Sequence, residues 1–311
     1  MSDISIQLAP GNKRGLMLAN PVIAASGTFG YGTEDGHPFD IQRLGAIVCK
    51  GTTLEPREGN PQPRIAETPC GMLNSIGLQN IGVEALIKEK APVWATWRVP
   101  VIVNIAGKTV NEYAMLAGML EGVPGISGLE LNISCPNVKA GGAEFGSGAA
   151  SAGRVTSAVR KSSSLPLLVK LTPNVTDITE IALAAESAGA DAISLINTIK
   201  GMAIDIHRRR PLLGALTGGL SGPAIKPVAL AMVYQVAGAV KIPVIGGGGI
   251  ACGVDAVEFL MAGASAVEVG TATLVNPGAP VEIIEGIEEF MREQGVDSLR
   301  GLIGAARREP V

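Results

Sequence analysis

Cys135 has the residue type and the sequence setting of a catalytic base. It stands in the motif NISCPN and is followed by the glycine-rich segment VKAGGAEFGSG. A free thiol has a pKa of about 8.5, and nearby lysines or helix dipoles stabilise the thiolate, which can abstract a proton. Cysteines more often serve as small buried core residues, and we interpret Cys49 and Cys252 in that way. The proline and the glycines beside Cys135 instead favour a functional site.

Two lysines, Lys50 and Lys170, end apolar runs that read VCKG and LVKL. A lysine at the end of a buried strand is desolvated, so its charge needs an anionic partner. We expect that partner to be the edge of a cofactor ring or a substrate carboxylate. The alternative is a salt bridge from either lysine to a carboxylate at a strand end.

Asparagines form a second set of candidate binding residues. Asn74, Asn132 and Asn197 stand in NSIGL, LNIS and LINT, and Asn104 stands in VNIAG. An amide both donates and accepts hydrogen bonds, so a group of amides suits a neutral cyclic imide or the edge of a cofactor ring. A single asparagine is more often a turn residue or a helix cap, but several at one face favour recognition of a ligand.

The segments IPVIGGGGI and VEVGTA supply the phosphate-binding chemistry. They end two apolar runs that follow one another in the sequence. Backbone N–H groups can approach a phosphate closely where side chains are absent, as in a glycine-rich turn. The alternative is that the glycines only permit tight turns where the chain is crowded.

Metal sites and nucleophilic triads are disfavoured. The chain has only two histidines, and its four cysteines form no C-x-x-C pair. Neither a zinc or iron–sulfur site, nor a serine–histidine triad, nor a disulfide framework is therefore predicted.

The elements that position these residues repeat along the chain. Short β-branched runs alternate with alanine-rich segments of helical period, which predicts a parallel sheet with crossover helices. We expect strands within 20–25, 45–50, 99–106, 128–133, 166–171, 191–197, 243–247 and 266–270.

A closed (β/α)8 barrel is favoured over an open sheet. Similar half-units recur, such as VPVIVNIAG, LPLLVKLTP and IPVIGGGGI, and no G-x-G-x-x-G follows the first strand. In a barrel the carboxyl ends of the strands meet on one face, where active sites are built. We therefore expect residues 1–311 to form one barrel domain, with a long loop insertion at 51–80, an active-site lid near 135–148 and a third long loop at 198–222.

Composition restricts the class of partner. A net charge of −3 and a sequence pI near 5.6 give no general attraction to nucleic acid or to an anionic membrane. No window reaches about 18 apolar residues without a charge or a turn. We expect a soluble, cytoplasmic protein that acts on a small molecule.

Taken together, the segments NPVIAASGTFGYG, KGTTLEPREGNPQPRIAETPCGMLNSIGLQN, NISCPN and IPVIGGGGI resemble the class 1 dihydroorotate dehydrogenases. The resemblance covers essentially the whole predicted barrel. The first two segments resemble in particular the 1B subtype, which works with a separate iron–sulfur flavoprotein subunit. Class 2 enzymes differ, because they use a serine where this chain has Cys135.

The resemblance implies oxidation of dihydroorotate to orotate in pyrimidine biosynthesis, with one FMN per chain. Cys135 would take a proton from C5 of dihydroorotate while the flavin accepts hydride from C6. The positions that match the family's FMN contacts are Ser26, Lys50, Gly51, Asn104, Asn132, Lys170, Ile196, Gly222, Gly248, Gly249, Gly270 and Thr271. Those that match its orotate contacts are Lys50, Asn74, Ser75, Ile76, Gly77, Leu78, Asn132, Asn197 and Thr198.

The resemblance also implies how electrons leave the chain. In the 1B subtype a homodimer of the catalytic chain binds a subunit that carries FAD and a 2Fe–2S cluster, and this heterotetramer reduces NAD. The absence of a Rossmann fingerprint and of clustered cysteines here agrees with such a partner. The alternatives are the fumarate-dependent 1A subtype, a dihydropyrimidine dehydrogenase-like enzyme and a non-catalytic flavin-binding barrel.

Overall fold

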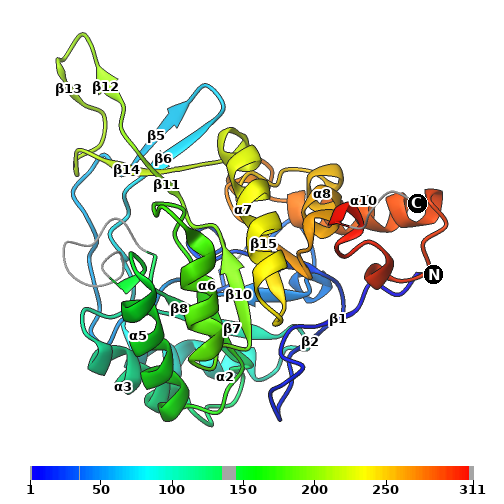
Figure 1. Ribbon diagram of the computed structural model, residues 1–311. Helices are drawn as coiled ribbons and strands as arrows, with labels where there is room; N and C mark the ends of the chain where they lie inside the picture. The colour runs from blue at the N-terminus through cyan, green and yellow to red at the C-terminus, as the bar shows by residue number, and fades with distance from the viewer. Residues whose placement is uncertain (1, 35, 135–144, 308–311) are drawn as a thin grey trace.

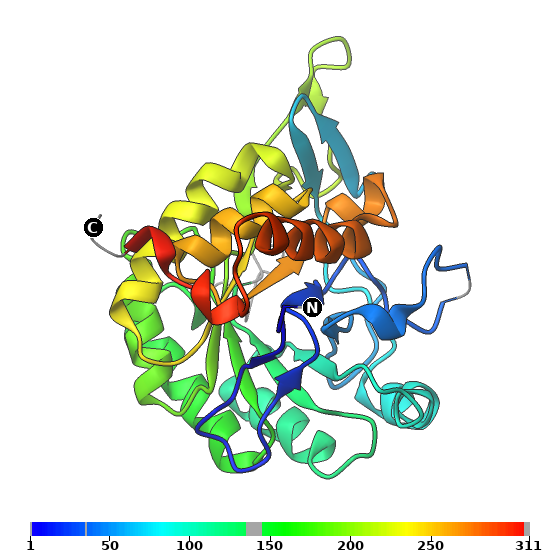
Figure 2. The same ribbon diagram turned by 90° about the vertical axis from the view of Figure 1, so that its right-hand side faces the viewer.

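The computed structural model describes residues 2–34, 36–134 and 145–307, and its centre is a closed barrel of parallel strands (Figure 1, Figure 2). Around the barrel the order is β10, β15, β16, β3, β4, β7, β8, β9. The strands are β3 (Val22–Ala24), β4 (Ala46–Val48), β7 (Val101–Ile105), β8 (Gly128–Asn132), β9 (Leu167–Lys170), β10 (Ala192–Leu195), β15 (Val244–Gly247) and β16 (Ala266–Val269). Each lies within a range predicted from an apolar run, so the (β/α)8 barrel is confirmed.

Helices cover the outside of the barrel (Figure 1, Figure 2). The longer ones are α3 (Val110–Leu120), α5 (Ala149–Ser162), α6 (Ile178–Ser187), α7 (Lys226–Ala239), α8 (Gly253–Ala262) and α10 (Ala279–Glu293). Side chains cap the starts of α3 and α6, because Thr109 accepts a hydrogen bond from the Glu112 amide and Asp177 accepts one from the Thr179 amide. None of the helices in the described parts of the chain is long and apolar enough to cross a membrane.

Short helical segments connect the larger elements. They are α1 (Val83–Ala85), the π-helical turn η2 (Leu86–Lys90), α2 (Ala91–Trp94), α9 (Ala272–Val275) and the 3-10 turns η1 (Ile41–Arg43), η3 (Pro223–Ile225), η4 (Leu299–Gly301) and η5 (Ala305–Arg307). Of these, α9 begins directly after β16 and Thr271. The helix α9 therefore lies at the carboxyl end of β16, next to the site described below.

The interior of the barrel changes from apolar to polar along the strands. Ile102, Leu168, Ala192 and Ala266 belong to one fully buried apolar cluster, together with residues of the hairpin β1 (Ile6–Gln7) and β2 (Met17–Leu18). Two residues further along each strand, on the same face, stand Asn104, Lys170, Ser194 and Glu268. The apolar layer therefore supports a polar layer nearer the carboxyl ends of the strands.

A second, antiparallel sheet is built from two of the predicted loops. It has the order β11 (Ile199–Gly201), β14 (Gly218–Ser221), β6 (Gly71–Asn74), β5 (Ile65–Thr68). The expected loops at 51–80 and 198–222 thus pair with each other. A further hairpin, β12 (Ile204–Asp205) and β13 (Arg210–Pro211), projects away from the barrel in Figure 1.

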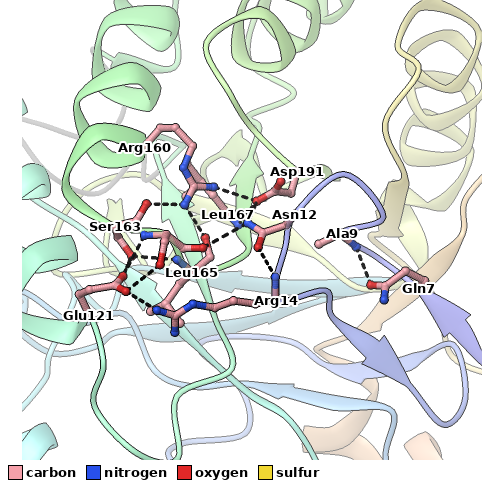
Figure 3. A network of polar contacts seen from close by, with 11 residues as sticks. Gln7, Ala9, Asn12, Arg14, Glu121, Arg160, Ser163, Leu165, Leu167 and Asp191 are labelled. Atoms are coloured by element: carbon pink, nitrogen blue, oxygen red, sulfur yellow. Dashed lines mark hydrogen bonds and ion pairs between the residues drawn. The ribbon is translucent and has the colours of Figure 1, made fainter.

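A polar network joins the amino-terminal segment to the barrel at the amino ends of its strands (Figure 3). Arg14 pairs with Glu121, which also accepts hydrogen bonds from Ser163 and Ser164. Arg160 pairs with Asp191 at 2.9 Å, and Asn12 donates to the same carboxylate at 3.0 Å. These contacts hold the amino-terminal segment against the end of the barrel at which the strands begin.

Candidate active site

One cavity of about 360 Å³ collects nearly all of the predicted site residues. It lies at the carboxyl ends of the barrel strands, and residues of β5, β6 and β14 also line it. All of the predicted cofactor residues line it: Ser26, Lys50, Gly51, Asn104, Asn132, Lys170, Ile196, Gly222, Gly248, Gly249, Gly270 and Thr271. So do Asn74, Ile76, Gly77, Leu78, Asn197 and Thr198 from the predicted substrate set.

Two predicted residues are not part of this lining. Ser75 is buried beside it, where its hydroxyl accepts a hydrogen bond from the Asn60 amide at 2.8 Å. Cys135 lies outside the described residues. Its preceding neighbour, Ser134, is buried and receives a hydrogen bond from Asn197 at 2.8 Å.

Free backbone amides mark one end of the cavity. Among the described residues, no acceptor receives a hydrogen bond from the amides of Gly248, Gly249, Gly270 or Thr271. Buried or half-buried N–H groups normally have partners, so four unpaired donors on two adjacent strand ends indicate a site for an anion.

Backbone geometry explains why glycine is needed at this end. Gly248 and Gly249 have φ angles of +117° and +81°, a region that residues with a Cβ rarely adopt. A Cβ on Gly249 would also lie 2.7 Å from the Cβ of Lys226. These glycines therefore do permit tight turns, as the alternative interpretation of the sequence held. They also line the cavity, and their amides have no acceptor among the described residues.

Lys170 stands in a buried charge cluster below the cavity. Its Nζ contacts Glu268 Oε2 and lies 3.7 Å from Glu130 Oε1. The salt bridge that the sequence left open as an alternative is thus present, and Lys170 lines the cavity as well. Burial alone would lower the pKa of Lys170, but attraction to the two carboxylates outweighs it and raises the pKa above its ordinary value.

Amides connect this cluster to the rest of the site. Asn104 donates to Glu130 and accepts a hydrogen bond from Asn132 at 3.2 Å. Asn132 in turn accepts hydrogen bonds from the amide and the hydroxyl of Ser134. The asparagines therefore form a connected row whose orientation is fixed before any ligand binds.

Lys50 differs from Lys170 because it has no ion-pair partner among the described residues. It is half-buried on the cavity wall, and desolvation lowers the pKa of its ammonium below the ordinary value. An unpaired, partly desolvated cation of this kind is suited to bind a ligand carboxylate.

Sequence analysis does not single out Glu130, Glu268 or Ser194, which the structure adds to the site. Glu130 and Glu268 are each the one charged residue inside an apolar strand, in GLELN and AVEV. A carboxylate in such a strand needs a buried partner, and this is the signal that could have identified both.

Comparison with known proteins shows which family the chain resembles. The family model described as dihydroorotate dehydrogenase matches residues 11–291. The chain is 56% identical over 303 residues to dihydroorotate dehydrogenase B (NAD(+)), catalytic subunit, of Pelobacter propionicus, covering 97% of this chain and 98% of that protein. It is 58% identical over 294 residues to the protein of the same name from Desulforudis audaxviator, covering 94% and 96%.

A solved structure shows the same fold. The crystal structure of dihydroorotate dehydrogenase from Eimeria tenella in complex with ferulenol aligns with a TM-score of 0.80, covering 98% of this chain and 89% of that one, at 24% identity. This likeness concerns the fold alone. The family model and the relatives, however, extend over nearly the whole chain, and the chain belongs to the dihydroorotate dehydrogenase family.

Proposed function

We propose that this chain oxidises dihydroorotate to orotate in pyrimidine biosynthesis, with NAD as the final electron acceptor. The observation that carries the proposal is a single cavity that joins four unpaired backbone amides to a row of asparagines and two lysines. Relatives that match the chain over nearly its whole length are named as catalytic subunits of dihydroorotate dehydrogenase B (NAD(+)).

FMN is the proposed cofactor, one per chain, and the cavity fits it. The unpaired amides of Gly248, Gly249, Gly270 and Thr271 would hold the phosphate, and glycine conformation keeps that end free of side chains. Lys170, Asn104 and Asn132 would contact the flavin ring from the polar layer of the barrel. Bound FMN would supply the acceptor for the hydride of the substrate.

The residues around Lys50 would bind the substrate. Lys50 would pair with the carboxylate of dihydroorotate, and the amides of Asn74, Asn132 and Asn197 would hydrogen-bond its ring. The run from Ile76 to Leu78 and Thr198 would complete the pocket, while Ser75 would act indirectly by holding Asn60. Orientation of the ring by fixed amides lowers the entropic cost of reaching the reactive geometry.

Cys135 is the proposed base that takes the C5 proton. Its sequence motif supports the assignment, and so does the contact of its neighbour Ser134 with Asn132 and Asn197. Among the described residues that line the cavity there is no histidine, and the one carboxylate, Glu268, is already paired with Lys170.

The assembly that we propose has a second kind of subunit. The relatives are named as catalytic subunits, which implies a partner in those proteins. We infer a homodimer of this chain that binds a subunit with FAD and a 2Fe–2S cluster, as a heterotetramer in the cytoplasm.

Anaerobic mixing tests the function directly. The chain is reconstituted with FMN, mixed with dihydroorotate and followed by the visible absorbance of the flavin, with dihydrouracil as the matched control. We expect rapid bleaching with dihydroorotate and little with dihydrouracil, which lacks the carboxylate for Lys50. Failure to bind FMN, or bleaching by dihydrouracil alone, would contradict the proposal.

A further inference from the structure

The charge cluster below the cavity contains one acid more than its lysine can balance. Glu130, Glu268 and Lys170 are 0%, 4% and 7% exposed. With both glutamates ionised, the cluster would carry a net negative charge on side chains that are almost fully buried. Uncompensated buried charge is energetically costly even after relaxation of the surroundings.

The hydrogen bonds of the two glutamates show which of them lacks donors for both of its oxygens. Both oxygens of Glu130 have donors, since Ser194 Oγ donates to Oε1 at 2.9 Å and Asn104 donates to Oε2. Glu268 Oε2 contacts Lys170, but Glu268 Oε1 is buried and has no partner among the described residues. Glu268 and Glu130 nevertheless converge on one ammonium, since Glu268 Oε2 contacts Lys170 Nζ and Glu130 Oε1 lies 3.7 Å from it.

Two ionised carboxylates cannot hydrogen-bond to each other, because neither has a proton to donate. A proton on Glu268 Oε1 turns that oxygen into a donor toward Glu130. It also removes the unpaired buried acceptor and makes the cluster electrically neutral.

We propose that Glu268 is held as a carboxylic acid that donates a hydrogen bond to Glu130, and that it acts as a positioning residue which fixes Lys170 and sets the charge presented to the cofactor. The inference deepens the proposed function and rests on FMN as the ligand of the cavity. Glu268 lines the cavity, so its charge is placed where a bound ring would be affected.

The electrostatics of the surrounding strands agree with this assignment. Burial and then repulsion by Glu130 raise the pKa of Glu268 to about 8, and attraction to Lys170 opposes them only in part. Burial opposes ionisation of Glu130, but Lys170 and the hydrogen bonds to it keep its pKa below the ordinary value. One acid is therefore protonated near neutral pH and the other is ionised.

The groups that face Glu268 from neighbouring elements are few. Lys170 comes from β9 and Glu130 from β8, while β7 and β10 contribute the neutral Asn104 and Ser194. The neighbours of β16 in the barrel, β3 and β15, contribute only apolar residues and glycine. Cys49, after β4, interacts with Glu130, and burial raises its pKa to about 12, so it stays neutral.

A pH dependence follows from this arrangement. Electrons added to a bound flavin ring make deprotonation of Glu268 less favourable, so reduction should take up an additional fraction of a proton at pH values around the pKa of Glu268. The midpoint potential of the bound FMN should therefore fall more steeply with pH in the wild type than in a variant that cannot titrate here.

Glu268→Gln is the test variant, because its amide can donate to Glu130 and accept from Lys170 without titrating. Glu285→Gln is the charge-matched control, since Glu285 is exposed on α10 and pairs with Arg43. Glu130→Gln is a second variant, in which Glu268 becomes the only carboxylate beside Lys170 and should ionise near neutral pH.

Infrared spectroscopy of the protein without FMN is the first measurement. We expect a carboxylic-acid carbonyl band near neutral pH in the wild type and in Glu285→Gln, lost above about pH 8 and absent from Glu268→Gln and Glu130→Gln. A wild type without that band, or a band that persists in Glu268→Gln, would overturn the inference even if a variant folds poorly.

The second measurement is the midpoint potential of bound FMN as a function of pH. Wild type and Glu285→Gln should show the same steep slope above neutral pH, and Glu268→Gln a shallower one. Equal slopes in all three would overturn the role of Glu268. A chain that does not bind FMN would contradict the proposed function, whereas the infrared result would still decide the protonation of Glu268.

Discussion

Polar side chains replace apolar ones in the barrel layer that faces the cavity, and this exchange has an energetic cost. Lys170, Glu130 and Glu268 are all buried, and burying charges is expensive even when they are paired. Apolar residues of similar volume would stabilise the barrel equally well or better. We infer that these three residues serve the site more than the stability of the fold.

Strand-end residues could be predicted from the sequence, whereas the pairing of Lys170 with a carboxylate on another strand could not. Asn104, Asn132 and Lys170 each interrupt an apolar run near its end, which indicates a site at the carboxyl face of a barrel. The partner of Lys170 is Glu268, which lies 98 residues away in the sequence. No local pattern encodes a contact between strands that meet only when the barrel closes. Cys252, interpreted as a buried core residue, is exposed because it precedes the surface helix α8.

Replacement of Cys135 tests the proposed base. Cys135→Ala should slow reduction of bound FMN by dihydroorotate by a factor on the order of 10² or more, the usual loss for a general base. Orotate binding should persist, because the lysine and amide contacts remain. Rapid-mixing absorbance measures the reduction rate, and Cys70→Ala, an exposed cysteine, is the control. A wild-type rate in Cys135→Ala at neutral pH would remove this residue from the mechanism.

At the scale of elements, the barrel strands were predictable and the second sheet was not. The barrel strands are β-branched apolar runs, buried on both faces, and such runs have a strong local signal. In contrast, β6 and β14 contain glycines, as GMLN and GGLS, and pair Asn74 with Gly219 across a long stretch of chain. Their strand conformation depends on that pairing, so the sequence indicates only long loops.

Gly249→Ala tests the turn between β15 and α8. The φ of +81° and the contact with Lys226 predict a loss of stability of about 1 kcal/mol or more. Displacement of the turn should also move the amides of Gly248 and Gly249, so affinity for FMN should fall more than stability alone explains. Flavin fluorescence titration measures the affinity, and chemical unfolding measures the stability.

The matched control is Gly118→Ala in α3, where a Cβ would meet no atom within 4 Å. This change should leave FMN affinity unchanged and stabilise the helix by about 0.5–1 kcal/mol. Equal FMN affinity of Gly249→Ala and the wild type would show that the amides after β15 do not hold the phosphate.

At the scale of the whole molecule, the polar network of Figure 3 should make the stability of the fold depend on pH in the acid range. Burial opposes ionisation of Glu121, but hydrogen bonds from Ser163 and Ser164 outweigh it and lower the pKa from 4.5 to about 2. A lowered pKa in the folded state contributes stability above the unfolded value and loses it as pH falls toward the folded value.

Glu121→Gln should therefore be less stable than the wild type above about pH 5, and the difference should shrink as pH falls from about 4.5 toward 2. Chemical unfolding at several pH values measures this difference. Glu293→Gln, an exposed position on α10, should show no such convergence. A pH-independent difference for Glu121→Gln would mean that shape, and not charge, makes the network stabilising.

The route of electrons out of the molecule is the remaining property at this scale. The relatives are named for NAD(+), yet the described residues contain no cluster of metal-binding side chains and the sequence has no Rossmann fingerprint. We therefore propose that electrons from dihydroorotate reach NAD through a partner subunit, as the relatives' name of catalytic subunit suggests.

Assays of the isolated, FMN-loaded chain with three acceptors test this route. We expect turnover with an artificial dye, little with NAD or fumarate, and NAD reduction only after addition of the iron–sulfur flavoprotein subunit. Fumarate turnover would indicate a 1A-type enzyme, and rapid NAD reduction by the chain alone would contradict the need for a partner. The dye reaction needs only a working cavity. Turnover with the dye but not with NAD would therefore show that the site is active and that only the partner subunit is missing.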